Sequence, residues 1–308
     1  MAILIKEADV ENLVTMDMAI EAVEEAFKLQ GEHKVQNATR SRCRLNKAML
    51  HVMFAGLKAY TSGEKKTRFH VMLYDSNGIL LAMIQADKLG QMRTGAASAI
   101  ATKYMSRDNT ARLGIIGTGW QARAQVEAIC AVRRIRDITA FSRDSENCRK
   151  FCDEMSETTG ISASPAETAE AAVREMDILV TATSSSEPVL MGEWLSEGAH
   201  INAIGSNSLS RQELDVDAVR KCDCVIVDSN EQAKLEAGDL ARAEEEEAFY
   251  WEDARELGLV VVGEYPGRED PKEITLFESQ GIALEDIALA ARVYAKANEE
   301  GVGEKLVL

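Results

Sequence analysis

The stretch Leu113-Gly114-Ile115-Ile116-Gly117-Thr118-Gly119-Trp120-Gln121-Ala122 joins an apolar run to a glycine-rich turn, and a helical pattern follows over residues 124–132. This order of strand, tight turn and helix is typical of the segment that binds the pyrophosphate of a dinucleotide. The first glycine permits the turn, the second lets the backbone approach a phosphate, and the small Ala122 lets the helix pack on its strand. The N–H groups that open the helix would face the phosphates. We therefore expect a dinucleotide-binding domain around this turn.

Composition and charge exclude several classes of protein. The chain has 308 residues, of which 46% are hydrophobic and 28% charged, an ordinary composition for a folded chain of about two domains. A net charge of −16 argues against nucleic-acid binding, since no basic face is available. The four histidines show no paired spacing and the six cysteines no disulfide or zinc spacing, so we expect no metal site. No apolar run reaches membrane-spanning length and no signal pattern opens the chain, which predicts a cytoplasmic location and no membrane association.

The pattern of apolar residues divides the chain into two parts. After an early amphipathic helix, strand-like runs cover residues 40–45, 49–54, 57–60, 69–74 and 79–85. Asn77-Gly78 predicts a hairpin between the last two runs, and the set predicts an antiparallel sheet, followed by a helix of small residues over 94–105. From residue 111 strands and helices alternate, which predicts a doubly wound parallel sheet. Its expected strands are 113–116, 137–141, 178–183, 200–204, 224–228 and 259–262. A last helix over 284–298 is expected to return to the first part.

Motifs spread along the chain point to one family. They are Gly56-Leu57-Lys58, Arg93-Thr94-Gly95-Ala96-Ala97, Ala101-Thr102-Lys103-Tyr104, the GTGWQARAQ run from Gly117, His200-Ile201-Asn202-Ala203-Ile204-Gly205, Gln212-Glu213-Leu214-Asp215 and Glu273-Ile274-Thr275-Leu276-Phe277. In this order they resemble the ornithine cyclodeaminase/mu-crystallin family over nearly the whole length. The resemblance implies an α/β fold, with a Rossmann-type doubly wound parallel sheet and an α+β domain built from both chain ends. We expect residues 1–109 with 283–308 to form the substrate-binding and dimerisation domain of a homodimer, and residues 110–282 the dinucleotide-binding Rossmann domain.

The resemblance also implies a substrate site. Family members act on amino acids or cyclic imino acids, and the shared α-carboxylate calls for fixed cations. The positions that match the family's site are Arg40, Lys58 and Arg93. Arg40, Arg42 and Arg44 alternate along one strand and face the same way, so each of the three remains a candidate. Arg93 is expected at the start of a helix, where its charge and the adjacent N–H groups would converge on one carboxylate. Lys58 beside Arg93 should have a lowered pKa and could relay a proton to the substrate nitrogen.

Asn207 departs from the family pattern. In cyclodeaminases and archaeal-type alanine dehydrogenases, the strand ending His-x-Asn-Ala-x-Gly leads to a catalytic aspartate two residues past the glycine. Here the run reads Gly205-Ser206-Asn207, and an amide cannot take up a proton at neutral pH. Ammonia loss from ornithine is thereby disfavoured, whereas imine reduction depends less on that carboxylate. Asp215 and Asp217, which follow closely, are interpreted as capping or surface groups.

The residues after the second Rossmann strand bear on the choice of nicotinamide cofactor. Sites that prefer NAD place an acidic side chain there, whereas this chain has Ser142 and then Arg143, which suits a 2′-phosphate. We expect NADP(H) to be preferred, with NAD(H) as the alternative. The expected cofactor-binding residues are Thr94, Gly117, Thr118, Gly119, Trp120, Gln121, Ala122, Ser142, Arg143, Thr181, Ala182, Thr183, Ala203 and Gly205.

The sequence thus predicts an NAD(P)H-dependent oxidoreductase that interconverts a small imino acid, either a cyclic ketimine or a linear imine, and its amino acid. Lys58 and Asn207 are the candidate catalytic residues. One alternative is an ornithine cyclodeaminase or alanine dehydrogenase that uses NAD, and both Asn207 and Arg143 speak against it. A further alternative is a non-catalytic, NADP-dependent binding protein like mu-crystallin. The retained cofactor and carboxylate signals disfavour that alternative.

Overall fold

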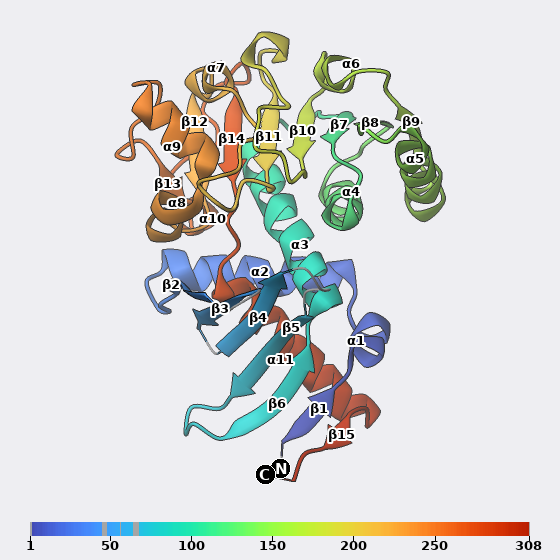
Figure 1. The fold of residues 1–308 in the computed structure, drawn as a ribbon, viewed down its shortest axis with the longest axis vertical. Helices are drawn as coiled ribbons and strands as arrows, with labels where there is room; N and C mark the ends of the chain where they lie inside the picture. The colour runs from blue at the N-terminus through green and yellow to red at the C-terminus, as the bar shows by residue number, and fades with distance from the viewer. Residues whose placement is uncertain (1, 45–47, 56, 64–67, 308) are drawn as a thin grey trace.

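The computed structural model describes residues 2–44, 48–55, 57–63 and 68–307. Gly56 of the Gly56-Leu57-Lys58 motif and Leu45 of the first expected strand run lie outside the described residues. Two sheets stand one above the other in Figure 1, and α3 (Asp87–Met105) runs from one to the other. The expected combination of a doubly wound parallel sheet with an α+β unit is confirmed.

The smaller sheet has seven strands in the order β15-β1-β6-β5-β4-β3-β2. They are β1 (Ile3–Ile5), β2 (Ala38–Arg44), β3 (Ala48–Phe54), β4 (Leu57–Gly63), β5 (Arg68–Tyr74), β6 (Leu80–Gln85) and β15 (Glu304–Lys305). Strands β2 to β6 pair antiparallel, as expected. The sequence did not reveal β1, which pairs parallel with β6 and antiparallel with β15, so that both chain ends meet at one edge of this sheet (Figure 1).

The hairpin between β5 and β6 follows the predicted turn chemistry. The Asp75 carboxylate accepts hydrogen bonds from the backbone N–H groups of Asn77 and Ile79, at 2.9 and 2.8 Å. Gly78 has a φ of +78°, a conformation that glycine adopts without strain. The turn therefore sets the register in which β5 and β6 pair.

Four helices cover the smaller sheet. They are α1 (Glu7–Leu13), α2 (Met16–Gly31), α3 and α11 (Ala283–Glu300). As expected, the last helix returns to the N-terminal part of the chain, where its apolar residues pack with those of α2 and α3 in one hydrophobic core. Glu7 accepts hydrogen bonds from the backbone N–H groups of Asp87 and Lys88, and so caps the N-terminus of α3. None of the helices in the described ranges is long and apolar enough to span a membrane.

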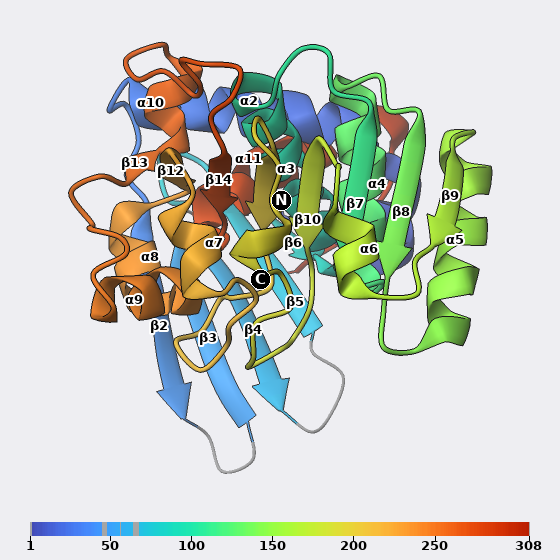
Figure 2. The same ribbon diagram turned by 90° about the horizontal axis from the view of Figure 1, so that it is seen from above.

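The larger sheet has eight strands in the order β13-β12-β14-β11-β10-β7-β8-β9, and all its strand pairs are parallel (Figure 2). They are β7 (Arg112–Ile116), β8 (Asp137–Phe141), β9 (Ser162–Pro165), β10 (Ile178–Thr181), β11 (His200–Ala203), β12 (Cys224–Val227), β13 (Arg255–Glu256) and β14 (Thr275–Glu278). The expected strand over 259–262 is wrong, since α10 (Leu257–Val261) occupies this segment. A short apolar run does not distinguish a buried helical turn from a buried strand. Strands β9 and β13 were missed because neither has an apolar pattern, and β14 was missed because it is short and buried throughout.

Short helices connect these strands. They are α4 (Trp120–Val132), α5 (Ser145–Thr159), α6 (Ala169–Val173), the 3₁₀ turn η1 (Gly192–Trp194), α7 (Val216–Arg220), α8 (Asn230–Glu236) and α9 (Gly238–Glu245). The expected capping role of Asp215 is confirmed, because its carboxylate accepts a hydrogen bond from Ala218 N at the start of α7. The small residues of α3 let it approach α4 closely, and a Cβ on Gly95 would lie 2.5 Å from Ala124 O.

Residues 279–282 connect β14 of the larger sheet to α11 of the smaller one. We call residues 279–281 the strap. The Asp228 carboxylate at the end of β12 accepts hydrogen bonds from the backbone N–H groups of Gln280 and Gly281, at 2.8 and 2.5 Å. The chain therefore passes between the two sheets at a point fixed by a buried side chain.

Candidate functional site

The glycine turn has the geometry that its sequence predicts. Gly117, directly after β7, has a φ of +99°, which L side chains rarely adopt. A Cβ at this position would lie 2.4 Å from Ala182 O, so the turn also brings two strand ends together. Both observations require glycine here.

The second glycine leaves open space in front of a helix. Gly119 is the N-cap residue of α4, no side chain caps this end, and a Cβ on Gly119 would have no neighbour within 4 Å. Ala122 is fully buried on the inner face of α4. Uncapped N–H groups at a helix start, beside a backbone that an anion can approach, fit the pyrophosphate of a dinucleotide.

A cavity of about 250 Å³ extends from this turn along the edge of the sheet, and we call it the cofactor-type cavity. Its lining residues are Ile116, Gly117, Thr118, Gly119, Phe141, Ser142, Arg143, Asn147, Ala182, Thr183, Ser184, Ser185 and Val189. Asp144, the nearest carboxylate after β8, accepts hydrogen bonds from Glu146 N and Asn147 N as the N-cap of α5. The Asp144 carboxylate is therefore engaged at the N-terminus of α5.

A second cavity, of about 230 Å³, brings together the expected catalytic and substrate-binding residues Arg40, Lys58, Arg93 and Asn207, and we call it the central cavity. Its lining residues are Arg40, Lys58, Tyr60, Phe69, Arg93, Thr94, Gln121, Ala182, Thr183, Ile204, Gly205, Asn207, Arg211, Ser279, Gln280 and Gly281. Thr181 and Ala203 are instead buried in β10 and β11, and Trp120 faces a neighbouring space on the other side of Lys58. The central cavity and the cofactor-type cavity share Ala182 and Thr183, so they adjoin at the carboxyl ends of the strands.

The sequence predicted Arg93 at the start of a helix, and this prediction is wrong. Arg93 lies inside α3, which begins at Asp87. The backbone N–H groups around it therefore serve the helix, and only its guanidinium reaches the cavity. Arg93 Nη1 donates to Glu285 Oε2 at 2.6 Å and Nε donates to Asp286 Oδ1 at 3.1 Å. Gly281 has a φ of +76°, which favours glycine, and a Cβ there would lie 2.5 Å from Arg93 Nη1, so a side chain at this position would also require the guanidinium to shift.

Lys58 is buried in the wall of the central cavity. Its Nζ donates to Asp286 Oδ1 at 2.7 Å and lies 5.2 Å from the ring centre of Phe69. Burial lowers the pKa of Lys58 to about 8, and Arg93 adds to this effect while Asp286 opposes it. The amine therefore changes its protonation near the physiological range, which a proton donor or acceptor requires.

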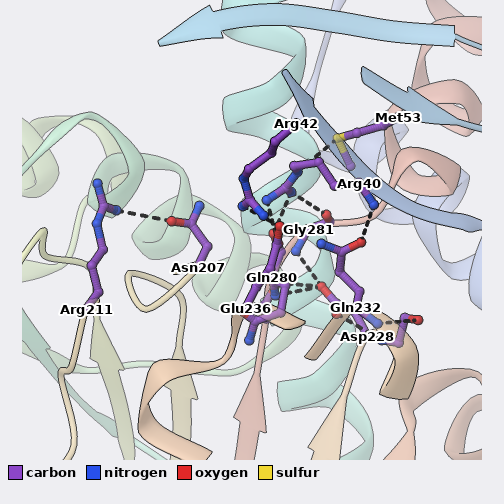
Figure 3. Close-up of polar contacts among 12 residues, drawn as sticks. Arg40, Arg42, Met53, Asn207, Arg211, Asp228, Gln232, Glu236, Gln280 and Gly281 are labelled. Carbon is purple, nitrogen blue, oxygen red and sulfur yellow. Dashed lines mark hydrogen bonds and ion pairs between the residues drawn. The ribbon is translucent and has the colours of Figure 1, made fainter. Parts of the chain in front are cut away.

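Arg40 is held by a buried carboxylate of α8 and by the strap. Its Nη1 donates to Glu236 Oε2 at 2.6 Å, and its Nη2 donates to the carbonyls of Gln280 and Gly281 at 3.0 and 2.9 Å (Figure 3). Arg42 pairs with the other oxygen of Glu236, so Arg40 and Arg42 share a face of β2, as predicted. Arg40 thereby fixes the strap and retains little donor capacity for a ligand.

Asn207 lines the central cavity from the loop after β11. Its Oδ1 accepts a hydrogen bond from Arg211 Nη1 at 3.2 Å, and the same nitrogen donates to Gly205 O at 3.2 Å (Figure 3). The amide is therefore oriented by a guanidinium, and the position offers hydrogen bonds without a proton-accepting carboxylate.

Sequence reasoning missed the buried carboxylates that hold these cations. Glu236, Glu285 and Asp286 have no exposed surface, and burial raises the pKa of Glu285 to about 7. Glu213 is also buried, and its two oxygens accept hydrogen bonds from Thr183 N at 2.6 Å and Gly205 N at 2.7 Å. The one available signal was the Glu285-Asp286 pair inside an otherwise apolar helix pattern. Its partners lie about 190 to 230 positions earlier in the chain, so spacing could not identify them.

The glycine turn and its cavity form a dinucleotide-type site at the carboxyl edge of a parallel sheet. This site adjoins the central cavity, which has buried cations. This combination defines the class of dinucleotide-dependent oxidoreductases whose substrates carry a carboxylate. The model of the ornithine cyclodeaminase/mu-crystallin family matches residues 2–301, and the chain belongs to this family.

Known proteins resemble the chain over most or all of its length. It is 38% identical to an alanine dehydrogenase of Archaeoglobus fulgidus, over 99% of this chain and 98% of that protein. It is 42% identical to a Δ1-pyrroline-2-carboxylate reductase of Bacillus cereus, over 79% of this chain and 75% of that protein. The structure of Thermococcus litoralis Δ1-pyrroline-2-carboxylate reductase in complex with NADH and L-proline superposes with a TM-score of 0.94 at 35% identity, covering 99% of this chain and 100% of that one. These relatives are oxidoreductases of imino or amino acids.

Proposed function

We propose that this protein is an NAD(P)H-dependent oxidoreductase that interconverts a small imino acid and its amino acid. The observation that carries the proposal is the junction at Ala182 and Thr183, where the cofactor-type cavity meets the central cavity. A nicotinamide cofactor bound along the glycine turn would supply or accept the hydride. The complex of the T. litoralis reductase with NADH and L-proline supports this assignment of class.

The cations of the central cavity would bind the substrate carboxylate. Arg93 Nη2 has no hydrogen-bond partner among the described residues, and Lys58 Nζ uses one of its three N–H donors for Asp286. Both cations are already balanced by buried carboxylates, so a bound carboxylate adds negative charge. Glu285, with a pKa raised to about 7 by burial, can take up a compensating proton. Arg40 would act mainly by holding the strap in place.

Lys58 would move the proton that accompanies hydride transfer. In reduction, its ammonium protonates the product nitrogen, and Phe69 and Tyr60 exclude water from the neighbourhood of the amine. Asn207 would orient the substrate by hydrogen bonds. Replacing Lys58 by methionine should remove the alkaline limb of the kcat profile and reduce kcat by about 10²-fold or more. A Lys58→Met enzyme with near-normal kcat and an unchanged pH profile would exclude this role.

The direct test of function follows the absorbance of the reduced nicotinamide. Purified protein is incubated with NADH or NADPH and with Δ1-pyrroline-2-carboxylate, Δ1-piperideine-2-carboxylate, or pyruvate with ammonia or methylamine. Consumption that depends on the imine supports the proposal. Absence of turnover over the whole panel, in a protein that still binds the cofactor, would instead support the binding-protein alternative.

Alanine dehydrogenase is a second candidate, favoured by the full-length similarity to the A. fulgidus enzyme. Its imine forms from pyruvate and ammonia in the active site, so the two candidates differ in where the C=N bond is made. Reduction of preformed cyclic imines, with no activity on pyruvate and ammonia, would support the imino acid reductase over the alanine dehydrogenase.

We further propose that NADP(H) is preferred over NAD(H). Ser142 and Arg143 line the cofactor-type cavity, Asp144 is engaged as a helix cap, and Arg143 forms no ion pair within the described part of the chain. Arg143 is thus available to donate two hydrogen bonds to a 2′-phosphate. Fluorescence titration should give tighter binding of NADPH than of NADH, and Arg143→Ala should remove most of the difference. Tighter binding of NADH by the unmodified protein would overturn this preference.

We also propose that residues 1–109 with 283–308 form the substrate-binding and dimerisation domain of a homodimer, and that residues 110–282 form the dinucleotide-binding domain. The half-buried Met72 and Met83 are cross-strand neighbours on β5 and β6, and the exposed Phe54 and Tyr74 lie on the same sheet. Apolar surface of this kind is typical of a face that a second subunit covers. Sedimentation of the protein at micromolar concentration should show a dimer.

A further inference from the structure

A third cavity, of about 470 Å³, opens beside the central cavity on the side away from the cofactor cradle, and we call it the outer cavity. Its lining residues are Arg40, Arg42, Met49, His51, Tyr60, Phe69, Asn207, Ser208, Ser210 and Arg211. Half of them also line the central cavity, so the two spaces adjoin around Phe69 and Asn207. The outer cavity shares no lining residue with the cofactor-type cavity, so the cofactor does not account for its chemistry.

The outer cavity is cationic in a chain that is strongly anionic. Arg40, Arg42 and Arg211 contribute three positive charges, and Glu236 is the one carboxylate that pairs with them among the described residues. The chain as a whole carries a net charge of −16. His51 adds no positive charge, because burial and the two neighbouring guanidinium groups lower its pKa to about 4. A local excess of cations of this kind attracts an anionic group.

Two of these guanidinium groups have unused donors. Arg211 uses Nη1 for Gly205 O and Asn207 Oδ1, while its Nε and Nη2 have no partner among the described residues. Among the described residues, Arg42 pairs only with Glu236, through Nη2, and its side chain is 32% exposed, compared with 0% for Glu236. Figure 3 shows Arg211 with Asn207 on one side and Arg42 with Glu236 on the other. The hydroxyl groups of Ser208 and Ser210, whose oxygens lie 3.0 Å apart, also line the outer cavity and add neutral donors.

We propose that Arg42 and Arg211 form a subsite for a second carboxylate, so that the substrate is a dicarboxylic imino acid. This inference rests on the proposed function, because it places the α-carboxylate at Lys58 and Arg93 in the central cavity. The distal carboxylate then reaches the outer cavity past Phe69 and Asn207. When a monocarboxylic imine is bound, the spare donors of both arginines bind water. A dicarboxylic imine is therefore preferred over a monocarboxylic one by the charge-assisted hydrogen bonds between its distal carboxylate and these donors.

The experiment compares imines that differ in the distal carboxylate. The protein with NADPH or NADH is supplied with methylamine and either oxaloacetate or 2-oxoglutarate, and in parallel with pyruvate or 2-oxobutyrate. We expect kcat/KM to be higher for the dicarboxylic imines by about tenfold or more. Arg42→Met and Arg211→Met should each lower this ratio by about tenfold. Arg242→Met, which removes an exposed arginine of α9 that lines neither cavity, should leave the ratio as it is.

Binding measurements separate failure of the subsite from failure of the proposed reaction. Calorimetry should show that L-glutamate or L-aspartate binds more tightly than L-alanine to the protein with NADP⁺, and that Arg42→Met removes the difference. Equal kcat/KM for the two classes of imine, or equal loss for both classes in the variants, would overturn the subsite while leaving the reductase proposal intact. If the dicarboxylic amino acids bind more tightly in a way that depends on Arg42, but no imine is reduced, the subsite is supported and the proposed reductase reaction is refuted. If the dicarboxylic amino acids bind no more tightly than alanine, the subsite is refuted whatever the reaction.

Discussion

Replacing Asp286 by asparagine removes the carboxylate that opposes the effect of burial on Lys58. Asp286 Oδ1 lies 2.7 Å from Lys58 Nζ, and Asp286 raises the pKa of the amine against burial and Arg93, which hold it at about 8. Two unit charges about 4 Å apart interact by roughly 4 kcal/mol at an effective dielectric constant near 20, which corresponds to about three pKa units. The asparagine oxygen still accepts the hydrogen bond, so we expect the pKa of Lys58 to fall by about one to two units.

The measurement is the pH dependence of kcat/KM for imine reduction. Because the ammonium form of Lys58 donates the proton, activity should fall as pH rises through the pKa of Lys58, near pH 8 in the unmodified enzyme. In Asp286→Asn this alkaline limb should move down to about pH 6–7. Glu285→Gln is the matched control, since Glu285 pairs with Arg93 and not with Lys58. Its alkaline limb should stay near pH 8, although the KM is free to change.

An alkaline limb that stays near pH 8 in Asp286→Asn would refute this reasoning, provided that the variant melts cooperatively and binds the cofactor. The limb would then belong to another group, and Lys58 would not be the proton donor. A limb that moves equally in Asp286→Asn and Glu285→Gln would show that the total charge of the cavity, and not the contact between Asp286 and Lys58, sets the pKa.

The remaining predictions concern the cradle and the packing around it. Gly119→Ala should change the free energy of unfolding by less than about 1 kcal/mol, because the new Cβ meets no protein atom within 4 Å. The same Cβ projects in front of α4 and should weaken NADPH binding about tenfold or more. Unchanged affinity in a fluorescence titration would contradict a pyrophosphate site at the glycine turn. Gly117→Ala should lower both stability and affinity, since this residue has a φ of +99° and no room for a Cβ, so a wild-type melting temperature would argue against the turn geometry. Glu213→Gln should lower the free energy of unfolding by about 1–3 kcal/mol in urea denaturation, because an amide NH₂ cannot accept one of the two buried backbone hydrogen bonds. The control is Glu170→Gln at an exposed position, which should leave the stability unchanged. Gly95→Ala should cost about 1–3 kcal/mol by forcing α3 and α4 apart, and a variant as stable as the parent would show that the two helices can separate without loss.

The fold could be predicted largely from local sequence. The glycine turn, the alternation of strands and helices after residue 111 and the Asn77-Gly78 hairpin each depend on a few neighbouring residues, and the structure confirms all three. The failures occurred where local signals are ambiguous. Residues 257–261 form a short buried helix, and β13 and β14 are too short or too buried to show a period.

The candidate site was predicted less completely. Lys58, Arg93 and Asn207 were singled out by motif, and the structure places all three in the central cavity. The carboxylates that pair with Lys58 and Arg93 come from α11, far away in the chain. The outer cavity depends on Arg42 and Arg211, which line one space although they lie far apart in the chain.

The sequence by itself determined most of the elements and the glycine turn, because strand periodicity, turn chemistry and the steric freedom of glycine act over a few residues. The sequence also predicted the lowered pKa of Lys58, but the tertiary structure decided the other electrostatics and the balance of charges around this amine. The pKa of Lys58 and the orientation of Arg40 depend on burial and on carboxylates more than 190 positions away in the chain, and the cationic character of the outer cavity depends on arginines brought together from distant segments. Charges interact through the space between them and through the dielectric around them, and neither is fixed until the chain has folded.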